Sequence, residues 1–268
     1  MDADTSRRGS LVDRLASAGC VAAEREADEL LAAAISPGHL EASVARRCRG
    51  EPIAWIVGTT TFAGLRLRVE SGVYVPRPHS EQVARAALAR LPDHGIAYDV
   101  ATGSGAVAAL LVAHRPGARV VGLDLDPRAV ACARSNGVDA RVSDLLGGLE
   151  ASHAGRVDVV VAVLPYVPTP HLPLLARDTL DHEDVRWYDG GAAGVGLLAR
   201  LVVQARPALA PGGALVVELG VDQADLLAPT LAEAGLHVEQ LLTDEEGDLR
   251  GLVAVRADRG AAGRPPLG

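Results

Sequence analysis

The sequence contains no lysine, few aromatic residues and no paired cysteines. Every residue of the Lys and Arg class is arginine, and this bias, together with the heavy use of Ala, Gly and Val, is typical of a GC-rich genome rather than of a function. Cys20, Cys48 and Cys132 are scattered and form no C-x-x-C pair. We therefore expect three small core residues, and neither a disulfide framework nor a bound metal.

Long apolar runs and positive charge are also missing. No stretch approaches the ~18 to 20 apolar residues of a membrane-spanning helix, and the N-terminal segment MDADTSRRGS lacks the apolar core of a signal peptide. The formal net charge is -8, whereas nucleic-acid binding depends on clustered basic residues. These absences predict a cytoplasmic protein that contacts no membrane, and they argue against a nucleic-acid partner.

The residues that are present have the balance of a globular protein, with 49% hydrophobic and 22% charged residues in a chain of 268. Up to about residue 50 apolar residues recur at helical spacing, as at Leu11 and Leu15, whereas Leu65, Leu67 and Val69 alternate with charged residues. We expect four parts: an N-terminal helical domain (1–56), a β-hairpin linker (57–75), a main domain (76–258) and a disordered tail (259–268).

Beyond residue 95, apolar β-rich runs alternate with helical segments. The runs are IAYDVA, ARVVGLDL, DARVSDL, VDVVVAVL and GALVVELG. This alternation is typical of βαβ units around a buried parallel sheet. The last segment, GLHVEQLLTDEEGDLRGLVAVRA, instead holds two strand-like runs joined by a short turn. A parallel sheet closed by an antiparallel pair predicts the α/β fold of class I methyltransferases, with a Rossmann-like seven-stranded sheet.

Three acidic residues follow three successive predicted strands. Asp99 precedes the glycine-rich turn ATGSG and suits a ligand ammonium group, Asp124 can accept both hydroxyls of a ribose, and Asp144 is in reach of an adenine amino group. Any one of them alone is equally explained as a helix cap or turn residue. Because open α/β sheets bind ligands at the carboxyl ends of their strands, the three together predict S-adenosylmethionine as the cofactor and S-adenosylhomocysteine as its product.

Several further segments carry a resemblance to a known family. They are RCRGEPIAWIVGTTTFAGLRLRV, VYVPRPHSE, DLDPRAVACARSN, LPYVPT, DGGAAGVGLL and LAPGGALVVELGVDQ. In order and spacing they resemble the bacterial HemK/PrmC family, which methylates the glutamine side-chain nitrogen of release factors. LPYVPT with DHED is most similar to an actinobacterial side branch of that family. The resemblance implies a helical domain on the substrate side, a hairpin linker and a cofactor-binding catalytic domain. By position, it implies cofactor contacts at Thr102, Gly103, Gly105, Asp124 and Asp144.

The family's tetrapeptide Asn-Pro-Pro-Tyr aligns with Val163, Leu164, Pro165 and Tyr166. In the family the Asn oxygen and the next backbone carbonyl accept the two N–H protons of the substrate amide, which aims the nitrogen at the methyl group. Val163 cannot accept a hydrogen bond. An unpaired amide proton in a dry site costs roughly 1 to 3 kcal/mol, and a lost transition-state contact costs on the order of 100-fold in rate. We predict these four positions as catalytic, together with Glu183, an acid that the family shares.

Three functions stay open at this point. The first, which we favour, is methylation of a small electron-rich natural-product substrate, for example at indole C3 with pyrroloindoline formation, because an apolar residue at Val163 suits it. The second is protein-(glutamine-N5) methylation of a release factor or another protein. The third is a nucleic-acid amino-methyltransferase or an inactive paralogue. No oligomeric state is predicted.

The segment TLDHEDVRWYDGG supplies the predicted substrate contacts, because acidic and aromatic side chains can bind a cation or stack on a ring. With one arginine from VYVPRPHSE, the predicted substrate-binding residues are Arg77, His182, Trp187 and Tyr188.

Overall fold

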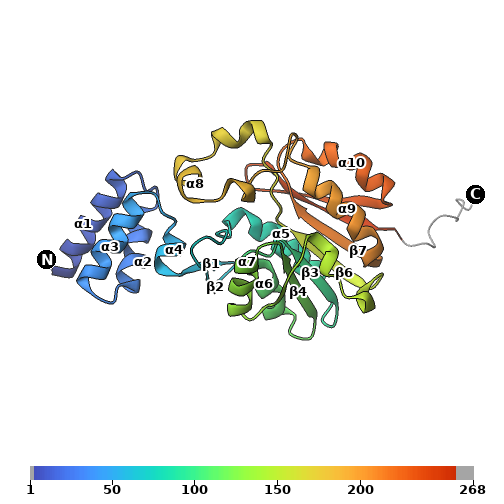
Figure 1. The fold of residues 1–268 in the computed structure, drawn as a ribbon, viewed down its shortest axis with the longest axis horizontal. Helices are drawn as coiled ribbons and strands as arrows, with labels where there is room; N and C mark the ends of the chain where they lie inside the picture. Colours follow the sequence, from blue (N-terminus) through green and yellow to red (C-terminus); the bar gives the residue numbers. More distant parts are fainter. Residues whose placement is uncertain (1–2, 258–268) are drawn as a thin grey trace, which may run out of the picture.

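The computed structural model describes residues 3–257, and the predicted disordered tail lies outside the described residues. Its N-terminal part is a cluster of helices at one end of the molecule (Figure 1). These helices are α1 (Ala3–Ser17), α2 (Ala23–Ala33), α3 (Pro37–Cys48) and α4 (Ile53–Val57). Leu15, Leu30, Leu40 and Val44 are buried among them, so this part has an apolar core of its own.

A two-stranded antiparallel hairpin follows, with β1 (Thr59–Phe62) paired to β2 (Leu65–Arg68). Its turn residues Ala63 and Gly64 both have positive φ, at 48° and 83°, which is the backbone of a tight two-residue hairpin turn. Phe62 and Leu67 are buried in the core of the main domain. The hairpin is therefore packed onto the main domain. The domain boundaries at residues 56 and 75 stay predictions.

The main domain is built on a seven-stranded sheet with the order β5-β4-β3-β6-β7-β9-β8. β3 to β7 are parallel, and β9 runs antiparallel to both β7 and β8. The strands are β3 (Ile96–Val100), β4 (Arg119–Asp124), β5 (Asp139–Val142), β6 (Val157–Ala162), β7 (Leu209–Glu218), β8 (Leu236–Thr243) and β9 (Leu249–Arg256). The predicted α/β fold class and its antiparallel closing pair are confirmed.

Helices cover both faces of this sheet, which explains why its strands are apolar (Figure 1). The helices α5 (Glu81–Arg90), α6 (Ala106–His114) and α7 (Pro127–Ser135) pack into one apolar core, and α9 (Gly196–Ala208) and α10 (Gln223–Glu233) pack into the other. The central strand β6 reads VDVVVA and is almost fully buried, as expected for a parallel strand covered on both faces.

The remaining helical segments are short and lie in the connections. They are α8 (Arg177–His182) and the 3-10 turns Pro78–Ser80, Leu145–Gly148, Ala151–His153, Thr169–Leu174 and Val185–Trp187. Several of them follow the carboxyl ends of β5 and β6 and so surround the edge of the sheet where ligands bind in this fold. Within residues 3–257, no helix is long and apolar enough to cross a bilayer.

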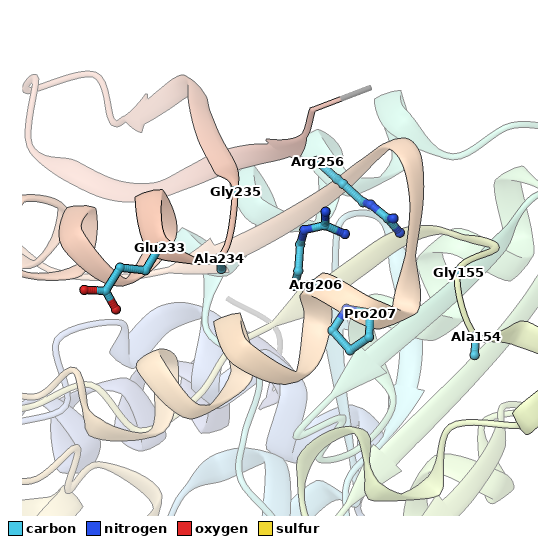
Figure 2. A pocket seen from close by; sticks show the side chains of 8 residues that line it. All are labelled: Ala154, Gly155, Arg206, Pro207, Glu233, Ala234, Gly235 and Arg256. Carbon is cyan, nitrogen blue, oxygen red and sulfur yellow. The ribbon is translucent and has the colours of Figure 1, made fainter. Parts of the chain in front are cut away.

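A shallow hollow of about 660 Å³ lies at the opposite edge of the sheet (Figure 2). Gly155 and Pro207 in its lining precede β6 and β7, and Gly235 precedes β8. Figure 2 shows Arg206 and Arg256 close together, whereas Glu233 points away from them. Because these residues lie at the amino ends of the parallel strands, the hollow is not at the position where open α/β sheets bind a cofactor.

Candidate active site

A larger cavity of about 780 Å³ opens at the carboxyl ends of β3, β4 and β6. Most of the residues predicted from the sequence line it: Arg77, Gly103, Asp124, Asp144, Val163, Leu164, Pro165, Tyr166, Trp187 and Tyr188. Asp99, Thr102, Gly105, His182 and Glu183 are predicted residues outside this lining. The cavity therefore has two ends. We call the part near the glycine loop the cofactor end and the part near Val163 and Tyr166 the acceptor end, because the group that accepts the methyl would lie there.

The glycine loop between β3 and α6 needs its glycines for two different reasons. Gly103 has φ +57°, and a Cβ there would meet nothing within 4 Å, so its backbone borders open space in the cavity. Gly105 has φ +82°, and a Cβ there would meet Ala133 and Val138 at 3.0 Å. Gly103 thus leaves room for a ligand, while Gly105 lets α6 begin close to its neighbours.

Asp99 lies beneath this loop rather than in the cavity. Its Oδ2 accepts hydrogen bonds from Thr102 Oγ1 at 2.6 Å and from the backbone N–H of Ala108 at 3.0 Å. Burial raises the pKa of Asp99 to about 7, and these two hydrogen bonds oppose the rise. These contacts fit an anchor for the loop, and the predicted contact of Asp99 with a ligand ammonium group stays a prediction.

Asp124 presents its carboxylate to the cavity from the end of β4. Oδ2 accepts the N–H of Gly103 and Oδ1 accepts the N–H of Asp126, both at 2.9 Å. Burial raises the pKa of Asp124, and the backbone hydrogen bonds oppose this. A carboxylate oxygen can accept two hydrogen bonds, and each of these accepts one from the backbone N–H groups named, so each keeps an acceptor position for a ligand hydroxyl. Asp144 also lines the cavity, but its Oδ2 lies 2.7 Å from the guanidinium of Arg200.

The acceptor end is a backbone segment held in place from several directions. Leu164 is buried, and no hydrogen bond from the described residues reaches its carbonyl. The Tyr166 carbonyl accepts a hydrogen bond from Gln223 Nε2 at 2.6 Å, and Val167 N–H donates to the Tyr188 carbonyl at 2.8 Å. Gly194 is required behind this segment, since a Cβ there would lie 2.2 Å from the Tyr166 oxygen.

Two of the predicted substrate-binding residues, Arg77 and Tyr188, form one polar cluster with Glu183, which was predicted as catalytic. Arg77 donates to Glu183 Oε1 at 2.5 Å and to the Tyr188 hydroxyl at 2.7 Å, and this hydroxyl donates to Glu183 Oε2 at 2.6 Å. Burial lowers the pKa of Arg77, but the Glu183 carboxylate together with Tyr74 and Tyr188 outweighs it, so the pKa is raised. Arg77 is therefore permanently charged, and buried Glu183 holds it and Tyr188 at the cavity wall.

Aromatic rings complete this wall. The Trp187 ring lies edge-on to Tyr74 and Trp55, with centroids 6.2 Å apart in each pair, and Tyr74 lies 5.8 Å from Tyr188. His182 is not part of the wall, because its Nε2 lies 2.7 Å from the Arg49 carbonyl of the N-terminal part. The structure therefore brings Trp187 and Tyr188 to the cavity and places His182 elsewhere.

Two lining residues, Tyr74 and His79, were missed from the sequence. Both flank Arg77 in the segment VYVPRPHSE, from which the sequence analysis predicted only Arg77 as a site residue. The available signal was their closeness to Arg77, since Tyr74 lies three positions before it and His79 two positions after it in one short proline-rich segment.

The cavity fits S-adenosylmethionine. Gly103 leaves open space beside a loop at the start of a helix, and Asp124 offers two oxygens with acceptor positions left. A family described as "Methyltransferase domain" matches residues 97–181. The fold is similar to the crystal structure of the ribosomal protein L11 methylase from Lactobacillus delbrueckii subsp. bulgaricus, with TM-score 0.51 and 20% identity over 72% of this chain and 86% of that one. Fold and site define a class I S-adenosylmethionine-dependent methyltransferase.

Curated relatives narrow this class. The chain is 33% identical to the release factor glutamine methyltransferase of Bradyrhizobium diazoefficiens, over 92% of this chain and 91% of that protein. It is 38% identical to the enzyme of the same name from Geobacter sulfurreducens, over 72% of this chain and 69% of that protein. The chain belongs to the release factor glutamine methyltransferase family, the HemK/PrmC family that the sequence motifs indicated.

The favoured prediction of a small natural-product substrate, such as an indole, is therefore wrong. The relatives that overturn it match this chain through nearly its whole length. The prediction was wrong because it inferred the substrate class from the residue at one position, Val163. The structure shows that the segment around it is kept in place by many contacts that do not depend on its side chain.

Proposed function

We propose that this enzyme methylates the side-chain amide nitrogen of a glutamine in a release factor. The observation that carries the proposal is the match to enzymes of that name over 92% of the chain, because it includes the N-terminal helices as well as the catalytic domain. A match restricted to the cofactor-binding part would indicate methyl transfer without indicating an acceptor.

The acceptor end of the cavity supports an amide substrate despite Val163. An amide nitrogen is a poor nucleophile because its lone pair is delocalised, so it needs acceptors for its N–H groups. The Leu164 carbonyl can accept one of them, and Pro165 and Tyr166 wall the place where the amide would lie. The bound cofactor supplies a methyl group on a sulfonium sulfur, and these residues align the nitrogen with it.

A second groove supports a macromolecular acceptor. It has a volume of about 620 Å³ and is lined by residues of α2, α3, α4 and the hairpin, including Arg47, Ile53 and Thr60. Arg77 and Thr179 line both this groove and the cofactor cavity. A protein segment lying in the groove would thus reach the cavity with one side chain, whereas a small substrate would leave the groove unused.

The test is transfer of a labelled methyl group from S-adenosylmethionine to a purified release factor, with the modified atom located by mass spectrometry. We expect one methyl group on a glutamine side-chain nitrogen. A release factor in which that glutamine is replaced by asparagine is the matched control and should stay unlabelled. Absence of label on the release factor, with an enzyme that binds the cofactor, would rule the proposal out.

A further inference from the structure

Glu218, the last residue of β7, is a buried carboxylate whose polar neighbours include the His79 ring and the Tyr166 hydroxyl. Its exposed fraction is 1%, and neither of its oxygens makes a hydrogen bond of good geometry within residues 3–257. Burying such a group costs free energy unless a charge or a donor compensates it. The ring nitrogen Nε2 of His79 lies 3.2 Å from Glu218 Oε1, so a small change of angle would complete a hydrogen bond between them.

His79 connects this carboxylate to the active site. It lies in the 3-10 turn Pro78–Ser80, its ring is 40% exposed, and it lines the same cavity as Val163 and Tyr166. Glu218 does not line that cavity. With Nε2 directed at a carboxylate, the proton of a neutral imidazole is held on Nε2, and Nδ1 is left as an acceptor.

The other ionisable groups around His79 and Glu218 are poor proton acceptors. Arg77 is held by Glu183 and Tyr188, and Arg250 donates to Asp244. Burial, with the nearby Glu218 carboxylate, raises the pKa of Tyr166, and burial raises the pKa of Tyr74 to about 12. Both phenols therefore keep their protons at neutral pH.

We propose that His79, held by Glu218, accepts the proton that the substrate amide nitrogen loses when it is methylated. The inference rests on the proposed amide substrate. A carbon–nitrogen bond forms as the carbon–sulfur bond of the cofactor breaks, and the sulfonium becomes a thioether. The amide N–H bond then gives its electron pair to nitrogen and its proton to His79 Nδ1. The half-exposed imidazolium afterwards releases that proton to water.

This role gives the Val163 position a physical meaning. An Asn there accepts an amide hydrogen bond but cannot take the proton away, whereas an imidazole can do both. His79 is thus the catalytic group of the pair, and Glu218 is a positioning residue that acts through it. The enzyme would retain one backbone acceptor, at Leu164, and use a side-chain base for the other N–H.

The first test needs no substrate. Nitrogen-15 NMR of the imidazoles, with the His79 signals assigned by their loss in His79→Gln, reports which ring nitrogen carries the proton. At pH 8 we expect the form protonated on Nε2, and we expect Glu218→Leu to abolish that preference. A His79 ring protonated on Nδ1, or doubly protonated at pH 8, would overturn the proposal, as would signals unchanged by Glu218→Leu.

The second test measures the rate of release factor methylation against pH. For His79→Gln we expect kcat to fall on the order of 100-fold, with KM for the release factor and cofactor affinity nearly unchanged. Any decline of the wild-type rate towards acid pH that comes from protonation of the base should disappear in the variant. Glu218→Leu should reduce kcat by about 10-fold and distort the same decline.

The control is His237→Gln, a substitution at an exposed histidine on the edge strand β8, which should leave kcat and the pH profile unchanged. Wild-type kcat and an unchanged profile in His79→Gln would refute the role of His79. If the wild-type enzyme fails to methylate a release factor, the proposed function is wrong, while the NMR measurement still decides whether Glu218 holds His79.

Discussion

The two ends of the active-site cavity are built in different ways. At the cofactor end, backbone N–H groups and two carboxylates determine the geometry: Asp124 accepts from Gly103 and Asp126, and Asp99 anchors the loop from below. At the acceptor end, side chains from distant segments meet, as in the contact of Arg77 with Glu183, 106 positions apart in the sequence. The first end depends on one loop and its two flanking strands, and the second depends on the whole fold.

This difference teaches how the enzyme can change one catalytic position without losing its activity class. The cofactor end has little freedom, because a Cβ at Gly105 would already press on Ala133. At the acceptor end a missing side-chain acceptor at Val163 can be replaced from another segment, since His79 and Tyr188 also reach the cavity. Three substitutions can break or sharpen this comparison.

The largest effect is expected for Asp124→Ala, at the cofactor end. It removes the carboxylate that is predicted to accept the ribose hydroxyls and frees the N–H of Gly103, so affinity for S-adenosylmethionine should fall about 100-fold or more. Isothermal titration calorimetry measures this directly. Asp139→Ala, at the amino end of β5 and away from the cavity, is the matched control and should bind S-adenosylmethionine with wild-type affinity. A dissociation constant for Asp124→Ala close to that of the wild type would remove Asp124 from the cofactor site.

A smaller effect, of opposite sign, is expected for Val163→Asn at the acceptor end. The new side chain adds an acceptor for the second amide N–H, so kcat for release factor methylation should rise roughly 10-fold, with cofactor affinity unchanged. Steady-state kinetics with a labelled methyl group provides the measurement. Val163→Leu keeps the site apolar and should bring no gain. A slower Val163→Asn enzyme would show that the acceptor end has adapted to Val163 and that the two ends are not independent.

A third effect, on stability and not on activity, concerns Asp99, which is buried beneath the glycine loop. Its pKa is near 3.8 in the unfolded chain and about 7 in the folded one, so between these values unfolding releases a proton. The unfolding free energy attributable to Asp99 should therefore fall as pH rises from about 4 to 7, by at most about 1.4 kcal/mol per pH unit. Asp99→Asn lacks this loss and should gain stability relative to the wild type over that window.

Urea denaturation at several pH values measures this difference. The variant keeps an amide oxygen for the hydrogen bonds from Thr102 and Ala108, so its fold should be retained. The exposed Asp139→Asn is the comparison for general charge effects. A stability difference between wild type and Asp99→Asn that is constant with pH would mean that Asp99 is ionised in the folded protein.

Much of the fold could be predicted from the sequence, because its signals are local. The alternation of apolar strands with helical segments gave the βαβ pattern, and strand ends were placed within a few residues, as for VDVVVA in β6. Asp124 and Gly103 could be placed in the cavity for the same reason, since parallel strands end at one edge of the sheet. The family motifs led to the same family that the relatives show.

The acceptor side was harder to predict, because a sequence motif does not reveal which distant residues compensate a change within it. The replacement of the family's Asn by Val163 could be recognised from the sequence, and a small, less polar substrate was inferred from that replacement alone. His79 lies in a segment from which only Arg77 was predicted as a site residue. Glu218 ends a strand that was predicted from its apolar residues. His182 was selected by its neighbours in the chain, yet it contacts Arg49 in the N-terminal part.

The sequence by itself therefore determined the fold class, the cofactor and the family, because periodicity, glycine spacing and acids at strand ends are properties of short segments. Only the tertiary structure decided which side chains share the acceptor end of the cavity. Glu218 meets His79, and Arg77 meets Glu183, because the strand order and the packed loops bring the end of β7 and the loop after β6 to the turn before α5. Such contacts are set by packing between segments far apart in the chain, which no local pattern encodes.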